Sequence, residues 1–140
     1  MSRTLLYNAN IVNEGEIFSG YIVTDGEFIA EVVRREAPFD ETTPDFGIVA
    51  SGCDMVIDCA GRLLLPGVID THVHFREPGM TEKGDIATES KAALAGGVTS
   101  FVDMPNTRPA TVTMATLEDK LQRASEVASA NYGFFIGATN

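Results

Sequence analysis

Residues 67 to 79, GVIDTHVHFREPG, hold both histidines of the 140-residue chain, His72 and His74, and Arg76 follows two positions later. Side chains two apart on a strand point to the same side, so the imidazoles are presented together, and Arg76 joins them if the extended backbone persists. Two imidazoles at this spacing can chelate a divalent ion from a rigid backbone. The pattern predicts a metal site. The alternative is a pair of hydrogen-bonded histidines at a polar strand end, since zinc sites need three or four ligands.

Two further polar residues are candidates for binding an anionic substrate. A guanidinium next to a bound metal ion places two positive charges close together, which is unfavourable unless an anion lies between them. The guanidinium of Arg76 could bind a carboxylate there with two parallel hydrogen bonds. Asn106, within DMPNTRP, follows a second apolar stretch, at the strand end where ligands bind in parallel α/β proteins. The alternatives are a surface arginine paired with Glu77 or Glu82, and for Asn106 a turn residue next to proline.

The elements that must position these residues alternate between strand and helix after Pro66. This order, with near-continuously apolar strands, indicates a parallel sheet covered by helices. An eight-stranded (β/α) barrel takes about 250 residues, so three strands and two helices would be its beginning; a small open sheet is the alternative for a complete protein. The predicted strands are GVIDTHVHF, VTSFVDM and YGFFIGA, and the predicted helices are 83–94, stopped by Gly96-Gly97, and the stripe Leu117, Leu121, Ala124 and Ala128.

The sequence before residue 63 is typical of β-structure. YIVTDGEFIAEVV has two strand-like runs flanking Asp25-Gly26, a dipeptide that tolerates the positive φ of a tight hairpin. The acidic, proline-containing RREAPFDETTPDFG is predicted to be a surface loop, and MVIDCAGRLLLPG a further apolar run. We therefore expect an α/β chain in two parts, a β-rich subdomain over 1–62 and the first β/α units of a barrel over 63–140.

Composition and charge restrict the class of partner. A net charge of -10 disfavours nucleic acid and anionic membrane surfaces. No apolar run approaches the roughly 20 residues of a membrane span, and the N-terminus lacks the apolar core of a signal peptide. We expect a cytoplasmic protein without a nucleic-acid or membrane partner, in which Cys53 and Cys59 are buried and reduced. Asp70 and Asp103 either orient ligands or cap turns and helices, and neither is assigned a role.

Two motifs, LPGVIDTHVHFREPG and KAALAGGVTSFVDMPNTRP, closely resemble those of dihydroorotases in the amidohydrolase superfamily. The resemblance runs from the β-rich part through residue 140. It implies zinc, one or two ions, on His72 and His74, and a substrate carboxylate held by Arg76 and Asn106. The implied activity is metal-dependent, reversible hydrolysis of L-dihydroorotate to N-carbamoyl-L-aspartate in pyrimidine biosynthesis, so the expected partner is this small-molecule substrate.

The family completes its site with residues from later strands. These are a bridging carboxylate, either aspartate or carboxylated lysine, two more histidines, and an aspartate that acts as general acid and base. The chain has no third histidine. The resemblance therefore implies that no catalytic residue lies within these 140 residues, and that they form the N-terminal portion of a dihydroorotase, inactive alone and weak in metal binding.

Other members of the superfamily and a non-enzyme remain as alternatives. Allantoinases and hydantoinases resemble this sequence around the histidines, but the intact HFREP and MPNT sequences favour dihydroorotase. A non-catalytic, dihydroorotase-like scaffold that binds aspartate transcarbamoylase is the second alternative. Retention of His72 and His74 argues against it, because degenerate relatives typically lose metal ligands. A homodimer is compatible with either function.

Overall fold

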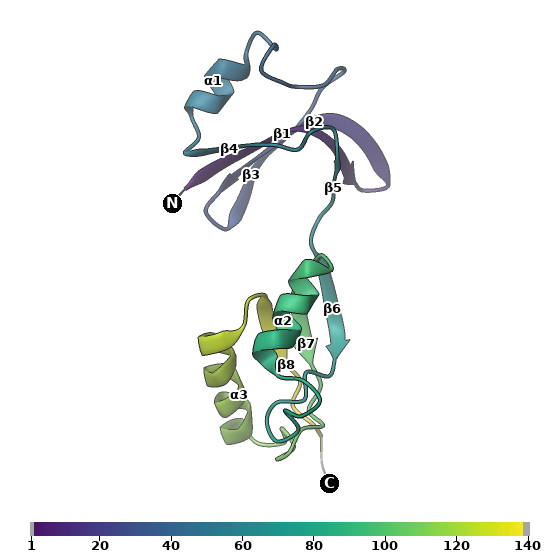
Figure 1. Cartoon of the computed structure of the whole chain (residues 1–140), viewed down its shortest axis with the longest axis vertical. Coiled ribbons are helices and arrows are strands. Elements are labelled where there is room, and N and C mark those ends of the chain that lie inside the picture. Colours follow the sequence, from purple (N-terminus) through teal and green to yellow (C-terminus); the bar gives the residue numbers. More distant parts are fainter. Residues whose placement is uncertain (1, 139–140) are drawn as a thin grey trace. The chain divides into compact units, whose positions relative to one another are not determined.

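The computed structural model describes residues 2–138 and consists of two compact units, Met1–Pro66 and Gly67–Asn140 (Figure 1). Each unit contains its own cluster of buried hydrophobic residues, so each is built around its own core. Within the described residues, no helix has the length and apolar character needed to cross a membrane.

The first unit is a mixed sheet. Its strands are β1 (Arg3–Asn13), β2 (Glu16–Asp25), β3 (Phe28–Arg34), β4 (Met55–Asp58) and β5 (Leu63–Leu64). The strand order is β3-β2-β1-β4, and β5 also pairs with β1. The first three strands are antiparallel neighbours, whereas β4 and β5 run parallel to β1. Every second residue of β1 from Leu5 to Ile11 is buried, which is the pattern of a sheet with one covered face.

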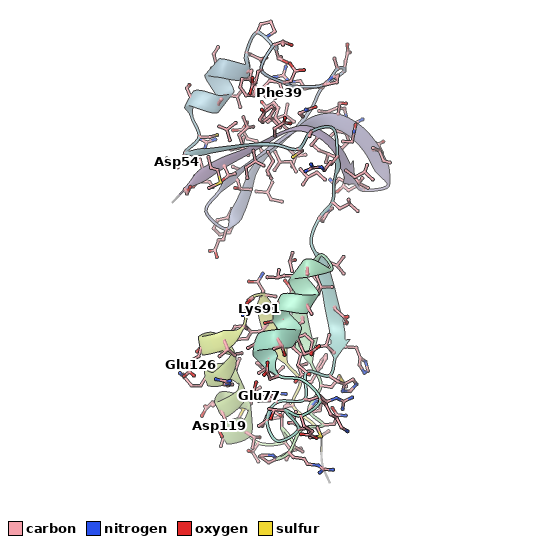
Figure 2. The ribbon with its side chains drawn as sticks, in the orientation of Figure 1. Phe39, Asp54, Glu77, Lys91, Asp119 and Glu126 are labelled. Atoms are coloured by element: carbon pink, nitrogen blue, oxygen red, sulfur yellow. The ribbon has the colours of Figure 1, made fainter. Side chains whose placement is uncertain are left out.

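The predicted hairpin is confirmed, but the predicted surface loop is only partly correct. β2 ends at Asp25, Gly26 takes a φ of 59°, and the chain returns at once as β3. Phe39 of the loop is fully buried, with its ring centroid 4.4 Å from that of Tyr21 (Figure 2). The loop then leads into α1 (Phe46–Ser51), which was not predicted. Burial of a large aromatic ring outweighs the polar character of its neighbours.

The second unit is a parallel sheet with helical crossovers, as predicted. Its elements are β6 (Val68–Val73), α2 (Ile86–Ala95), β7 (Val98–Asp103), α3 (Met114–Val127) and β8 (Asn131–Phe134). The strand order is β6-β7-β8, and both pairs are parallel. Helix α2 packs on β7 and α3 on β8, and the two helices also contact each other (Figure 1). Phe101 of β7 and Ala124 of α3 are buried in this core.

Local hydrogen bonds fix where the helices begin. Helix α2 starts three residues later than the predicted boundary, after Asp85, whose carboxylate accepts a 2.7 Å hydrogen bond from the backbone N–H of Thr88. Helix α3 starts after Thr113, which exchanges hydrogen bonds with Thr116 in a capping box. Gly96 ends α2, as predicted.

The prediction that YGFFIGA is a buried strand is wrong in part. Only its first residues belong to β8, and Tyr132 is 37% exposed. Phe135 and Ile136, which follow the strand, are 44% and 48% exposed. Helices in the crossovers cover one face of a sheet, so apolar side chains on its other face are not removed from water by them.

Candidate metal and substrate site

The predicted site residues lie where β6 and β7 end. His72 belongs to β6, and His74 is the first residue after that strand. Their imidazole rings are neighbours, with centroids 5.3 Å apart and planes inclined at 63°, and both residues are exposed. Two accessible ring nitrogens can therefore approach the same ion.

Strand β6 has a bulge at the segment that contains His72. Asp70 pairs with Phe101 and Val73 with Asp103, so β6 advances three residues while β7 advances two. The Asp70 carboxylate accepts a 3.0 Å hydrogen bond from the backbone N–H of His72 inside the bulge. Asp70 thus holds the backbone of a candidate ligand.

Asn106 contacts His74 from the end of the neighbouring strand. His74 Nδ1 lies 2.9 Å from Asn106 Oδ1, an oxygen that can only accept a hydrogen bond. In this orientation of the amide, Nδ1 is the donor, and the neutral tautomer of His74 that fits the contact has its lone pair on Nε2, the arrangement typical of an imidazole that binds a metal. The amide NH₂ of Asn106 remains able to donate to a ligand.

Arg76 does not continue the strand, so the condition under which it would lie on the same side as the two imidazoles, a persistent extended backbone, is not met. β6 ends at Val73, and Arg76 has a φ of 69°, in the left-handed region that non-glycine residues rarely adopt. Its side chain is half-buried. The considered ion pair with Glu77 or Glu82 is not formed among residues 2–138, where Glu77 instead pairs with Arg123 at 2.8 Å.

The loops that carry Arg76 and Asn106 pack against each other. The backbone N–H of Arg108 donates to the carbonyl oxygen of Pro78 at 3.1 Å. Gly79 has a φ of 82°, and a Cβ at this position would lie 1.9 Å from the Arg108 carbonyl oxygen. Only glycine permits this approach without displacement, so the two loops form one assembly.

Sequence reasoning missed Lys120 and gave Asp103 no role. Lys120 Nζ lies 2.6 Å from Asp103 Oδ2, and each side chain is 1% exposed. Asp103 Oδ1 also accepts a 2.9 Å hydrogen bond from the backbone N–H of Phe75. A lysine in a helix normally faces solvent. The available signal was its position four residues before buried Ala124, on the same helix face.

The donor set fits part of a metal site. Among residues 2–138, no three His, Cys, Asp or Glu side chains are grouped so that they could hold an ion. His72 and His74 alone supply two neighbouring imidazoles, the ligands that zinc accepts.

Known proteins resemble both the sequence and the fold. Residues 63–139 match the model of the amidohydrolase family. The dihydroorotase of Methanosarcina mazei is 43% identical over 110 residues, 79% of this chain and 24% of the relative. The dihydroorotase of Wolbachia from Brugia malayi is 41% identical over 120 residues, 86% of this chain and 25% of the relative. The chain thus spans about a quarter of the length of these curated relatives.

Solved structures share the fold of nearly the whole chain. The L-hydantoinase of Arthrobacter aurescens matches with a TM-score of 0.80 at 22% identity, over 98% of this chain and 28% of that one. The dihydropyrimidinase of Brevibacillus agri matches with a TM-score of 0.73 at 26% identity, over 99% and 28%. The predicted fold class, the start of a (β/α)8 barrel after a β-rich part, is confirmed. Because the model of the amidohydrolase family matches residues 63–139, more than half of the chain, the chain belongs to that family.

Proposed function

We propose that the protein is a dihydroorotase, a zinc-dependent cyclic amidohydrolase that interconverts L-dihydroorotate and N-carbamoyl-L-aspartate in pyrimidine biosynthesis. The observation that carries the proposal is the 2.9 Å contact between His74 and Asn106. It joins a candidate metal ligand to an amide suited to binding a carboxylate. The relatives named dihydroorotase support the choice of substrate.

His72 and His74 would hold one ion of a centre with one or two zinc ions. Asn106 keeps the proton of His74 on Nδ1, so that Nε2 is available as a ligand. When bound, zinc polarises a carbonyl group and lowers the pKa of a bound water to roughly 7. Residues 2–138 contain only part of such a centre, so we propose that this segment alone is inactive and binds metal weakly.

Arg76 and Asn106 would bind the carboxylate of the substrate. The guanidinium of Arg76 supplies charge and two parallel donors. The amide of Asn106 can donate one more hydrogen bond while its oxygen remains on His74. Because Asn106 contacts His74 and would also bind the carboxylate, the ring amide of the substrate would be oriented toward the metal.

The test uses the full-length gene product. We expect purified protein to contain zinc and to convert L-dihydroorotate to N-carbamoyl-L-aspartate. His72→Ala should lose metal and turnover together. Arg76→Met should raise KM at least 10-fold, because a charged donor pair to the substrate is removed, with metal content unchanged. Lys91→Met, which removes an exposed cation from α2, is the matched control (Figure 2).

Each other outcome selects a different function. Loss of metal in Arg76→Met would make Arg76 a structural residue. Turnover of hydantoins or allantoin in place of L-dihydroorotate would indicate a related cyclic amidohydrolase. Protein without metal or turnover would favour the non-catalytic scaffold, for which binding to aspartate transcarbamoylase is the direct assay.

A further inference from the structure

Two cationic residues of α3, Lys120 and Arg123, reach the short segment that carries Arg76. They are three positions apart on the helix and therefore lie on the same face. Lys120 acts on the segment through Asp103, and Arg123 acts through Glu77. The segment is thus tied to α3 on both sides of Arg76.

The first tie is buried. Asp103 uses one carboxylate oxygen to accept from the backbone N–H of Phe75 and the other to accept from Lys120 at 2.6 Å. Lys120 Nζ also lies 4.7 Å from the ring centroid of Phe134. The side chains of Lys120 and Asp103 are each 1% exposed, so their charges are screened little by solvent.

The second tie crosses from α3 to α2. Glu77 Oε1 accepts a 2.8 Å hydrogen bond from Arg123 Nε, and Glu77 Oε2 accepts a 3.0 Å hydrogen bond from the backbone N–H of Ile86, the first residue of α2. The Glu77 side chain is 12% exposed and lies between the two helices (Figure 2). Because both carboxylate oxygens of Glu77 accept hydrogen bonds, its side chain is held in place, and this restrains the backbone of Glu77 as well.

Arg76 has the backbone conformation that needs such restraint. Its φ of 69° is unfavourable for a residue with a Cβ, and such conformations persist where the surrounding structure fixes them. Its carbonyl oxygen accepts from the backbone N–H of Met80 at 3.1 Å, a further local restraint. Release of either tie would allow the backbone of Arg76 to relax and its guanidinium to move.

We propose that Lys120 and Arg123 are positioning residues that hold residues 75–77, so that Arg76 presents its guanidinium to the carboxylate of the substrate. The identity of the carboxylate rests on the proposed function. The restraint of residues 75–77 by α3 does not depend on it, and the two can be tested separately.

The first experiment compares Arg123→Met with Arg123→Lys in the full-length gene product, with Lys91→Met as control. The readouts are amide hydrogen exchange at Ile86, KM and kcat for L-dihydroorotate, and bound metal. Arg123→Met should accelerate exchange at Ile86 and raise KM roughly 10-fold with kcat within about twofold. Arg123→Lys should recover part of both effects, and Lys91→Met should show neither.

The second experiment addresses the buried tie without leaving an unpaired charge. Lys120→Met alone strands the Asp103 carboxylate in the core and endangers folding. Lys120→Met combined with Asp103→Asn removes both charges and keeps an oxygen that can accept from the Phe75 N–H. We expect faster amide exchange at Phe75 and a raised KM in this double variant.

The outcomes separate the inference from the proposed function. Unchanged exchange at Phe75 and Ile86 would overturn the inference, whatever the substrate. Accelerated exchange with unchanged KM would overturn the positioning of Arg76 while dihydroorotase activity stands. Loss of metal in Arg123→Met would place the effect on the histidines and also overturn it. A parent protein without dihydroorotase activity would refute the proposed function, and the exchange rates would still decide whether α3 restrains the segment.

Discussion

The two units differ in where they keep polar groups. Among residues 2–138, the buried polar and charged residues all belong to the second unit. They are Ser90, Asp103, Thr107, Thr111 and Lys120. The first unit buries apolar and aromatic side chains, and its ion pairs are exposed, as Arg3 with Glu31, or half-buried, as Arg35 with Asp45.

This difference follows the location of the candidate site. A buried polar group is unfavourable unless its hydrogen bonds are made, so each one constrains its surroundings. The hydroxyl of Thr107 donates to the carbonyl oxygen of Pro109, and the backbone N–H of Thr111 donates to that of Pro105, both at 2.9 Å. These contacts fix the loop of Asn106. With the exception of Ser90, whose hydroxyl accepts from the backbone N–H of Ser129, the buried polar residues lie on or next to the loop of Asn106, whereas the core of the first unit is apolar and aromatic.

The largest change in stability is expected when the buried ion pair between Lys120 and Asp103 is broken. Lys120→Met should lower the free energy of unfolding by about 3–5 kcal/mol, because the buried Asp103 carboxylate loses its only charged partner among the described residues. Arg34→Met, which removes the exposed pair with Glu16 in the first unit, should cost only about 0–1 kcal/mol. Urea unfolding measures both. Equal losses of unfolding free energy in Lys120→Met and Arg34→Met would show that the buried ion pair contributes no more to stability than the exposed one.

The apolar core of the first unit should show the second-largest effect. Leu5 is fully buried, and Leu5→Ala should cost roughly 3 kcal/mol through lost apolar contact and the remaining cavity. Ile17→Ala, at a position that is 65% exposed, is the control and should change stability little. A cost below about 1 kcal/mol for Leu5→Ala would contradict a core that depends on apolar packing.

Much of the fold was predictable because its signals are local. The hairpin at Asp25-Gly26 and the alternation of strands and helices after Pro66 follow from neighbouring residues and their spacing. Helix α1 was missed because six residues without a side-chain cap carry little signal. It is held by tertiary contact, with the Phe46 ring centroid 5.5 Å from that of Phe39.

The candidate site was predictable only as a set of residue types. Alternation along one strand suffices to suggest that His72 and His74 are neighbours. The φ of Arg76 and the bulge before it depend on pairing with β7 and on contacts from α3. The burial of Lys120 depends on Asp103, which is 17 positions away in sequence. Pattern and propensity do not contain such nonlocal contacts.

A smaller effect is expected at the start of α3, where the second unit gains stability from a solvent-exposed polar contact. Thr113 Oγ1 accepts from the backbone N–H of Thr116 at 3.2 Å, so Thr113→Ala should lower the free energy of unfolding by about 1 kcal/mol. Thr113→Ser keeps the hydroxyl and should remain near the parent. If serine destabilises as much as alanine, the cap is not the cause, and polar contacts of this unit matter only where they are buried.

The smallest expected effect is one that both units share. Hydrogen bonds from the backbone N–H and hydroxyl of Thr88 lower the pKa of Asp85 below its ordinary value of 3.8. In the first unit, hydrogen bonds from the hydroxyl and backbone N–H of Thr42 lower the pKa of Asp40 in the same way. A lowered pKa in the folded state stabilises the protein above the unfolded pKa, and this contribution disappears as pH falls through the folded value.

We therefore expect thermal stability to decline below about pH 4, and Asp85→Asn and Asp40→Asn each to flatten part of that decline. Melting temperatures measured from pH 7 to pH 2 test this, with Glu126→Gln as the control carboxylate on the exposed face of α3. Flattening by both aspartate variants would confine the contrast between the units to buried groups, because half-buried carboxylates then act alike in each. If only Asp85→Asn flattens the decline of melting temperature at low pH, the two units would differ also in the polar groups outside their cores.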